Sequence, residues 1–185
     1  MLEVEMKFPV RDFAAVETQL ARTDAHLNCT RQDIDQYFNA PDRDFAQTDE
    51  ALRIRRIGSA NFVTYKGPKL DARTKTRTEV EVPLADGAAT AEAFAQVLTH
   101  LGYRPVAVVQ KRRRLYHLER NTFSLEVTLD EVQGVGPFVE IETQAPTERL
   151  DEARRVVQEL ATALGLTASE RRSYLELLLE AQGKR

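Results

Sequence analysis

The sequence has no tryptophan, a single cysteine and no long apolar run. With Cys29 alone, no disulfide can form within the chain and a zinc site built on several thiolates is excluded, which fits a reducing compartment. No stretch approaches about 20 consecutive apolar residues, so we expect no membrane span. The opening segment MLEVEMKFPV carries two acids and alternates in polarity. We therefore expect no signal peptide and a cytoplasmic location.

An excess of basic residues is also lacking. The chain has 26 Lys and Arg against 29 Asp and Glu, a net charge of -3, so no overall positive field indicates a nucleic-acid partner. Hydrophobic residues make up 42% and charged residues 30%, which is ordinary for a folded protein. A length of 185 residues suits one domain with a real core, and no linker divides it. We take residues 1–185 as a single domain.

Short segments in which charged and apolar residues alternate dominate the chain. Such alternation is typical of β-strands with one apolar and one polar face. Elsewhere apolar residues recur with helical spacing, and there we expect Thr147 as an N-cap and Thr167 with Glu170 as a capping box. The predicted strands are 2–9, 31–38, 51–57, 61–67, 76–83, 106–118, 122–130 and 137–143, and the predicted helices are 11–21, 88–102, 147–165 and 167–182.

The polar faces of these strands carry pairs of like charges. Residues i and i+2 of a strand share a face, so each pair projects to the same side. For any one strand, an ordinary sheet with its charged face in solvent remains the alternative. Seven strands with charged residues on one face, five of them with such a pair, together favour a charged face that encloses an interior. The acid pairs are Glu3/Glu5, Glu79/Glu81 and Glu140/Glu142, and the basic pairs are Arg53/Arg55 and Lys111/Arg113.

Acids and bases that segregate by strand suit a ligand with both signs of charge. Metal cations would gather at the carboxylates, and phosphate oxygens would gather at the bases. A sheet of eight strands can close into a barrel with a narrow interior, and the amphipathic helices could cover its apolar outer face. The pattern therefore predicts an α+β fold, a β-barrel with flanking α-helices.

These motifs resemble the CYTH superfamily, the triphosphate tunnel metalloenzymes. EVEMK at 3–7 matches the family's ExExK signature at Glu3, Glu5 and Lys7. LRIR together with TYKGP looks most like the class IV adenylyl cyclase branch, whereas Asp33 stands where relatives often have glutamine. Further matching segments follow in order: DQYF at 35–38, LRIR at 52–55, TYKGP at 64–68, RTEVE at 77–81, QKRR at 110–113, LD at 129–130, EIE at 140–142 and SYLELL at 173–178.

The resemblance implies an eight-stranded antiparallel barrel, a triphosphate tunnel, that holds a small-molecule triphosphate with Mg²⁺ or Mn²⁺. Both metals prefer oxygen ligands, so Glu3, Glu5 and Glu142 are the first candidates, followed by Asp130 and Glu140. Ion pairs with facing bases are the alternative role of these acids. The predicted phosphate binders are Lys7, Arg53, Arg55, Lys66, Lys111 and Arg113, with Arg77 a lesser candidate. The predicted catalytic residues are Glu5, Lys7, Arg55, Lys111 and Arg113.

The first hypothesis for activity is an adenylyl cyclase that converts ATP to cyclic AMP and pyrophosphate. A triphosphatase acting on inorganic triphosphate, thiamine triphosphate or a nucleotide is the alternative, because both reactions share their ligands and differ in which phosphorus faces the nucleophile. A non-catalytic sensor of nucleotides or polyphosphate is an alternative of another class, although pure anion binding would not need so many carboxylates. We expect no nucleic-acid or membrane partner, and a homodimer is left open.

Overall fold

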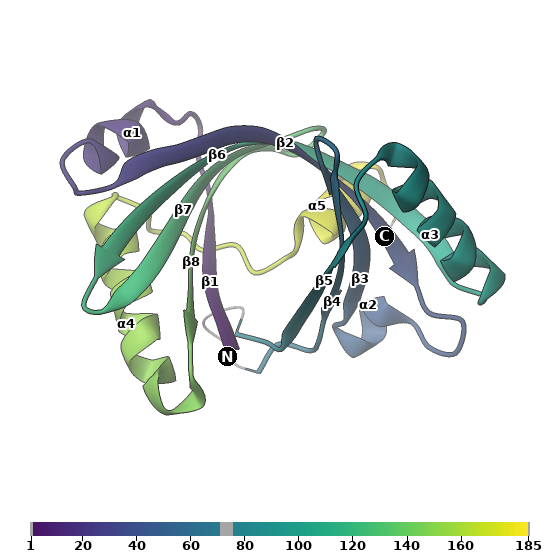
Figure 1. Ribbon diagram of the computed structural model, residues 1–185. Coiled ribbons are helices and arrows are strands. Elements are labelled where there is room, and N and C mark those ends of the chain that lie inside the picture. Colours follow the sequence, from purple (N-terminus) through teal and green to yellow (C-terminus); the bar gives the residue numbers. More distant parts are fainter. Residues whose placement is uncertain (1, 71–75, 185) are drawn as a thin grey trace.

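One antiparallel sheet of eight strands forms the centre of the computed structural model, which describes residues 2–70 and 76–184. The sheet curls into a half-barrel with helices on its flanks (Figure 1), so the predicted fold class is confirmed. The strand order is β1-β8-β7-β6-β2-β3-β4-β5. The strands are β1 (Leu2–Pro9), β2 (His26–Asn39), β3 (Ala51–Ile57), β4 (Ala60–Lys66), β5 (Glu79–Leu84), β6 (Arg104–Arg120), β7 (Phe123–Val132) and β8 (Gly136–Ala145).

The two edge strands approach each other along a seam. In the described part of the chain, one isolated antiparallel bridge between Glu3 and Arg77 connects β1 to the segment that leads into β5. The strand predicted from residue 76 thus begins at Glu79 as β5, and Arg77 takes part in the seam instead. The sheet curls far enough to enclose an interior, and its edges are held at this one bridge.

The long strands β2 and β6 exceed their predicted lengths. They pair with each other along almost their whole extent, from His26 with His117 to Asn39 with Arg104, and a register shift between Leu27 and Cys29 marks a β-bulge. The apolar residues at the start of β2, Leu27 and Cys29, are out of parity with Ile34 and Phe38 further along, so no single alternation runs through the strand. The neighbouring strand β6 pairs with these residues through backbone hydrogen bonds, and this pairing explains why they form part of a strand.

Helices cover parts of the outer face of the sheet. In α4, Val156, Val157 and Leu160 pack in one apolar cluster with Val4 of β1 and Ile141 of β8, all of them buried. The short helix α2 was not predicted, because four residues are too few to show helical periodicity. The helices are α1 (Ala14–Leu20), α2 (Phe45–Thr48), α3 (Ala88–His100), α4 (Leu150–Ala163) and α5 (Tyr174–Ala181).

Two predicted helix starts are wrong. Ser173 caps α5: its hydroxyl accepts a hydrogen bond from the Glu176 N–H at 3.1 Å, and the Glu176 carboxylate accepts one from the Ser173 N–H at 2.7 Å. The same spacing at Thr167 and Glu170 lies outside the helix, because the Glu170 N–H donates instead to the Lys7 carbonyl of β1 at 2.7 Å. Before α4, Thr147 begins a short 3₁₀ turn, and the N-cap position of α4 is Arg149.

Among the residues that the structure describes, no helix is both long and apolar enough to span a bilayer.

Candidate active site inside the curled sheet

A charged cavity occupies the concave side of the sheet. The outward side chains of β1, Val4, Met6 and Phe8, are buried in the apolar core, so Glu3, Glu5 and Lys7 project inward. The cavity has a volume of about 360 Å³ and is lined by every predicted site residue except Asp130. Those residues are Glu3, Glu5, Lys7, Arg53, Arg55, Lys66, Arg77, Lys111, Arg113, Glu140 and Glu142.

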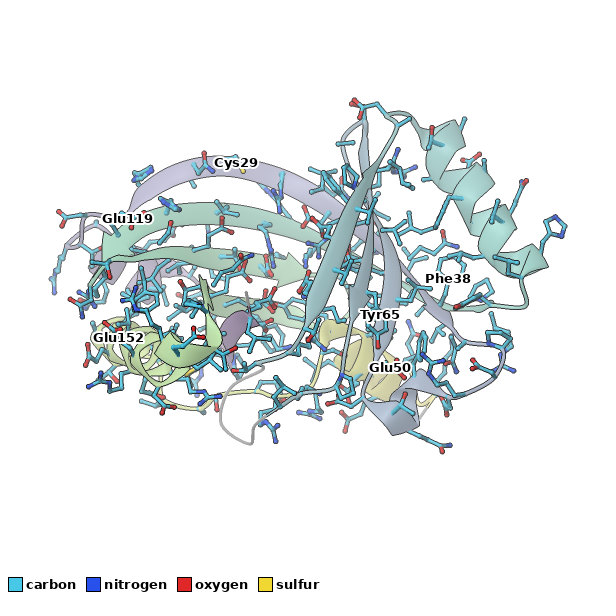
Figure 2. The ribbon with its side chains drawn as sticks, turned by 60° about the horizontal axis from the view of Figure 1, so that its bottom comes forward. Cys29, Phe38, Glu50, Tyr65, Glu119 and Glu152 are labelled. Atoms are coloured by element: carbon cyan, nitrogen blue, oxygen red, sulfur yellow. The ribbon has the colours of Figure 1, made fainter. Side chains whose placement is uncertain are left out.

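The lining continues beyond the predicted residues toward α2. Figure 2 shows Glu50 and Tyr65 beside this short helix, and the Tyr65 hydroxyl donates a hydrogen bond to the Glu50 carboxylate at 2.6 Å. The Arg43 guanidinium donates to both oxygens of the same carboxylate, at 2.8 and 2.9 Å. Glu50 is thus held by Arg43 and Tyr65.

Three carboxylates from β1 and β8 form a compact acidic group. Glu5 lies directly opposite Glu142, and one oxygen from each of Glu3, Glu5 and Glu142 lies within 4.8 Å of the others. Burial raises the pKa of Glu142 to about 7, where Arg113 opposes the rise and Glu140 and Glu5 add to it. Burial also raises the pKa of Glu3 well above its usual value, against the attraction of Lys66. Crowded carboxylates of this kind fit a hard divalent cation, which would offset their repulsion.

Asp35 of β2 organises three of the cations that face this acidic group. The Arg55 guanidinium binds it through two parallel hydrogen bonds of 2.7 and 2.8 Å, Arg53 Nη1 lies 3.5 Å from it and Lys111 Nζ lies 3.6 Å from it. Burial opposes the ionisation of Asp35, but Arg53, Lys111 and Arg55 outweigh it and hold the pKa well below its usual value. A permanently ionised carboxylate thus fixes the three cations in place.

Arg113 of β6 is held by two further acids. Its Nε and Nη2 donate to the two oxygens of Asp130 at 2.7 and 2.6 Å, and Nη2 also donates to Glu140 at 2.7 Å. Asp130 and Glu140 therefore contact a predicted phosphate binder and lie outside the three-carboxylate group. Their role as metal ligands stays a prediction, whereas their contacts show them holding Arg113.

The remaining predicted cations reach the cavity from β1, β4 and the seam. Lys66 of β4 forms ion pairs with Glu79 and, at 3.3 Å, with Glu3. Lys7 of β1 is almost fully buried and donates to the carbonyl of Arg172. Arg77 lines the cavity next to the bridge with Glu3. The structure thus brings all of the predicted phosphate binders into one space.

Tyr174 is a site residue that sequence reasoning missed. It is the first residue of α5, which lies across one end of the curled sheet (Figure 1). Lys7 Nζ lies 4.2 Å and Lys111 Nζ 5.2 Å from the centre of the Tyr174 ring, distances at which a cation is attracted to an aromatic face. Burial, reinforced by Glu140 and Asp130, raises the pKa of Tyr174 well above its usual value, so its hydroxyl stays protonated and donates to Asp130 at 3.0 Å.

The CYTH domain family matches residues 1–174. This chain belongs to that family. A Methanocaldococcus jannaschii protein named as a candidate adenylate cyclase is 38% identical over 96% of this chain and 98% of its own. The adenylate cyclase CyaB of Aeromonas hydrophila is 33% identical over 95% of this chain and 87% of its own. The predicted family is therefore confirmed.

Solved structures agree with the CYTH fold of the chain. A Pyrococcus horikoshii protein superimposes with a TM-score of 0.85 at 39% identity and covers 96% of this chain and 98% of its own. A Hippeastrum protein superimposes with a TM-score of 0.68 at 19% identity, covering 97% of this chain and 95% of its own. That protein is described as a candidate adenylyl cyclase with a dominant triphosphatase activity, and at this identity the likeness shows the fold alone.

Proposed function

We propose that this CYTH chain is a metal-dependent phosphoryl-transfer enzyme that converts ATP to cyclic AMP and pyrophosphate inside the curled sheet. One observation carries the proposal: three crowded carboxylates and a set of buried arginines and lysines share a single cavity. This arrangement suits a polyphosphate bound together with a divalent cation. The two relatives named as adenylate cyclases, at 38% and 33% identity, support the choice of reaction.

The residues of the cavity supply binding and orientation. Mg²⁺ or Mn²⁺ held by Glu3, Glu5 and Glu142 would lower the pKa of an attacking hydroxyl and offset charge on a departing phosphate. Arg55 and Arg113 each donate two parallel hydrogen bonds to one carboxylate, so their guanidinium groups need little reorganisation when phosphate oxygens arrive. No histidine lies among the described residues that line the cavity, so we assign no imidazole base.

A triphosphatase is the second candidate, because nothing in the phosphate-binding residues selects which phosphorus is attacked. The Hippeastrum protein with a dominant triphosphatase activity has the same fold, which makes this reaction a second one to measure. In that case the same cations would hold the triphosphate and a water molecule would be the nucleophile.

Incubation of the purified protein with ATP and Mn²⁺, followed by separation of the products, tests the proposal. We expect cyclic AMP and pyrophosphate in equal amounts, and none when EDTA is present. Release of inorganic phosphate from ATP or from tripolyphosphate would instead support the triphosphatase. Saturable, metal-dependent binding without any product would contradict both reactions and favour a sensor.

Triphosphate binding should weaken as the pH rises above about 8. Burial, helped by Arg113 and Arg55, lowers the pKa of Lys111 to about 8, so above this pH the free protein carries a neutral Lys111. A bound triphosphate favours the ammonium form, and binding must therefore take up a proton. We expect affinity to fall by up to about tenfold per pH unit in this range. Isothermal titration calorimetry with tripolyphosphate in EDTA, between pH 7 and 9.5, measures the effect.

The Lys111→Arg variant is the control for this pH dependence. An arginine stays protonated throughout this range, so its affinity should change much less with pH. Calorimetry at pH 8.5 in two buffers with different ionisation enthalpies should show proton uptake in the wild-type protein only. The same pH dependence in both proteins would mean that another group titrates.

A further inference from the structure

Arg31 is a cation in the cavity to which the sequence assigned no role. It lies on β2 beyond the part that pairs with β3. The residue opposite it on the neighbouring strand β6 is Arg113. Its side chain lines the cavity and is 29% exposed. Its Nε donates to Asp33 Oδ1 at 2.9 Å. Arg31 thus adds a cation to this wall beside Arg113, one of the residues that were predicted to bind phosphate.

The way Arg31 is anchored differs from that of Arg55 and Arg113. Arg55 and Arg113 each commit both Nε and Nη2 to a carboxylate. Arg31 commits Nε alone, and within residues 2–70 and 76–184 Asp33 is its one ion-pair partner. Its two terminal nitrogens are therefore available for two parallel hydrogen bonds to an anion, a geometry that suits a phosphate.

Asp33, which holds Arg31, is buried and has one carboxylate oxygen without a hydrogen bond in the described part of the chain. Its side chain is fully buried, and its Oδ2 makes no hydrogen bond among the described residues. The same oxygen lies 3.7 Å from Arg55 Nε, which connects this anchor to the cations around Asp35. A buried carboxylate between two arginines holds the Arg31 guanidinium at the wall of the cavity, near the cations around Asp35.

The spacing of residues along β2 determines where the Arg31 guanidinium lies. Asp35, Asp33 and Arg31 share one face, and residues two apart on a strand are separated by about 7 Å. Arg53, Arg55 and Lys111 converge on Asp35, while the Arg31 guanidinium is tied one step further along, at Asp33. The cations that are tied to β2 carboxylates therefore form a row whose length a chain of three phosphates can follow, and Arg31 is the last of them.

We propose that Arg31 binds the terminal phosphate of the bound triphosphate, so that the site prefers three phosphates to two, and that Asp33 is the residue that positions it. This inference rests on the proposed triphosphate site. The shared chemistry is a terminal phosphate, which either inorganic triphosphate or a nucleoside triphosphate can supply.

Calorimetry of the Arg31→Gln variant tests the proposal, with tripolyphosphate and pyrophosphate as probes in EDTA to prevent turnover. We expect affinity for tripolyphosphate to fall about 10- to 100-fold, the range for losing hydrogen bonds to a charged group, and affinity for pyrophosphate to change little. Arg112→Gln is the matched control: Arg112 neighbours Arg113 on β6 but is exposed and does not line the cavity. Both affinities should be unchanged in that variant.

The ratio of the two affinities decides the outcome, because a partly unfolded preparation changes the binding stoichiometry and leaves each dissociation constant intact. An equal loss for both anions in Arg31→Gln, or no loss for either, would overturn the role of Arg31. Failure of the wild-type protein to bind either anion, both in EDTA and in a repeat titration with Mn²⁺, would instead overturn the proposed triphosphate site. Arg31→Lys keeps the charge without the two parallel donors, so its preference for tripolyphosphate should be intermediate.

Two further measurements complete the test. Asp33→Asn removes a negative charge, so general anion affinity should hold or rise while the preference for tripolyphosphate over pyrophosphate falls. An unchanged preference in that variant would show that Asp33 does not position Arg31.

Titration with ATP and ADP in place of the inorganic anions shows whether the terminal phosphate of a nucleotide occupies the same place. The ratio of the affinity for ATP to the affinity for ADP should then also fall in Arg31→Gln.

Discussion

Replacing Glu5 with glutamine is expected to reduce turnover of ATP by at least about a hundredfold while the fold survives. Glu5 is 5% exposed and contributes one of the oxygens in the three-carboxylate group. Glutamine has nearly the same shape but no charge, and hard divalent cations bind a neutral amide less well than a carboxylate. Loss of the metal would remove several kcal/mol of stabilisation from the transition state, and each 1.4 kcal/mol is about tenfold in rate.

Product formation from ATP with Mn²⁺ measures this effect, and Glu131→Gln is the matched control. Glu131 lies on β7 next to Asp130 but is exposed on the opposite face. Thermal unfolding supplies a readout independent of activity. Mn²⁺ should raise the melting temperature of the wild-type and Glu131→Gln proteins and should have little effect on Glu5→Gln. A Glu5→Gln protein with near-normal turnover would show that the metal assignment is wrong.

The inward face of the sheet could be predicted because alternation is a local property of each strand. Glu3, Glu5 and Lys7 had to share a face, and so did Arg53 with Arg55 and the other pairs. Which face lies on the outside followed from the apolar residues. Val4 and Ile141 need to be buried, and α4 packs against them. Such reasoning places residues on a face, and the structure confirms those placements in the cavity.

Partners across the sheet could not be predicted, because they depend on which strands are neighbours and in which register. Asp130 was assigned to the metal from its charge, its place on the polar face of the strand and its match to the family. In the structure it lies opposite Arg113, since β7 pairs with β6, and it becomes the partner of that arginine. In the same way Asp35 lies opposite Arg55. The sequence showed the charges, but the pairing of β2 with β3 and of β6 with β7 determines which of them neutralise each other.

The contribution of the C-terminal segment was hidden for a different reason. The spacing that marks a capping box occurs twice within ten residues, at Thr167 and at Ser173, and local sequence does not choose between them. A contact between residues distant in sequence determines that Ser173 is the cap, because the Glu170 N–H is already hydrogen-bonded to the Lys7 carbonyl of β1. That contact sets where α5 begins and thereby places Tyr174 over Lys7 and Lys111.

Replacing Arg113 with methionine should give the largest loss of stability of any single change in the cavity. Methionine keeps much of the volume but leaves Asp130 and Glu140 buried without their shared partner. Removing one member of a buried ion pair costs about 3–5 kcal/mol, because the remaining charge is uncompensated. For a chain of this size that corresponds to a melting temperature lower by about 6–20 °C. Chemical denaturation at pH 7, with Arg112→Met as the exposed control on the same strand, measures the difference.

The pH dependence of this loss separates a charge effect from a packing effect. In the wild-type protein burial opposes the ionisation of Asp130, but Arg113 and Lys111 hold its pKa below the usual value, so this carboxylate stabilises the fold above its unfolded pKa and ceases to do so in acid. Without Arg113 much of that attraction is lost, while burial still disfavours the ionised form. The difference in the free energy of unfolding between the wild-type and Arg113→Met proteins should therefore be largest near neutral pH and decrease as the pH falls toward 4. A gap that stays constant over this range would mean that Arg113 stabilises the fold by packing alone.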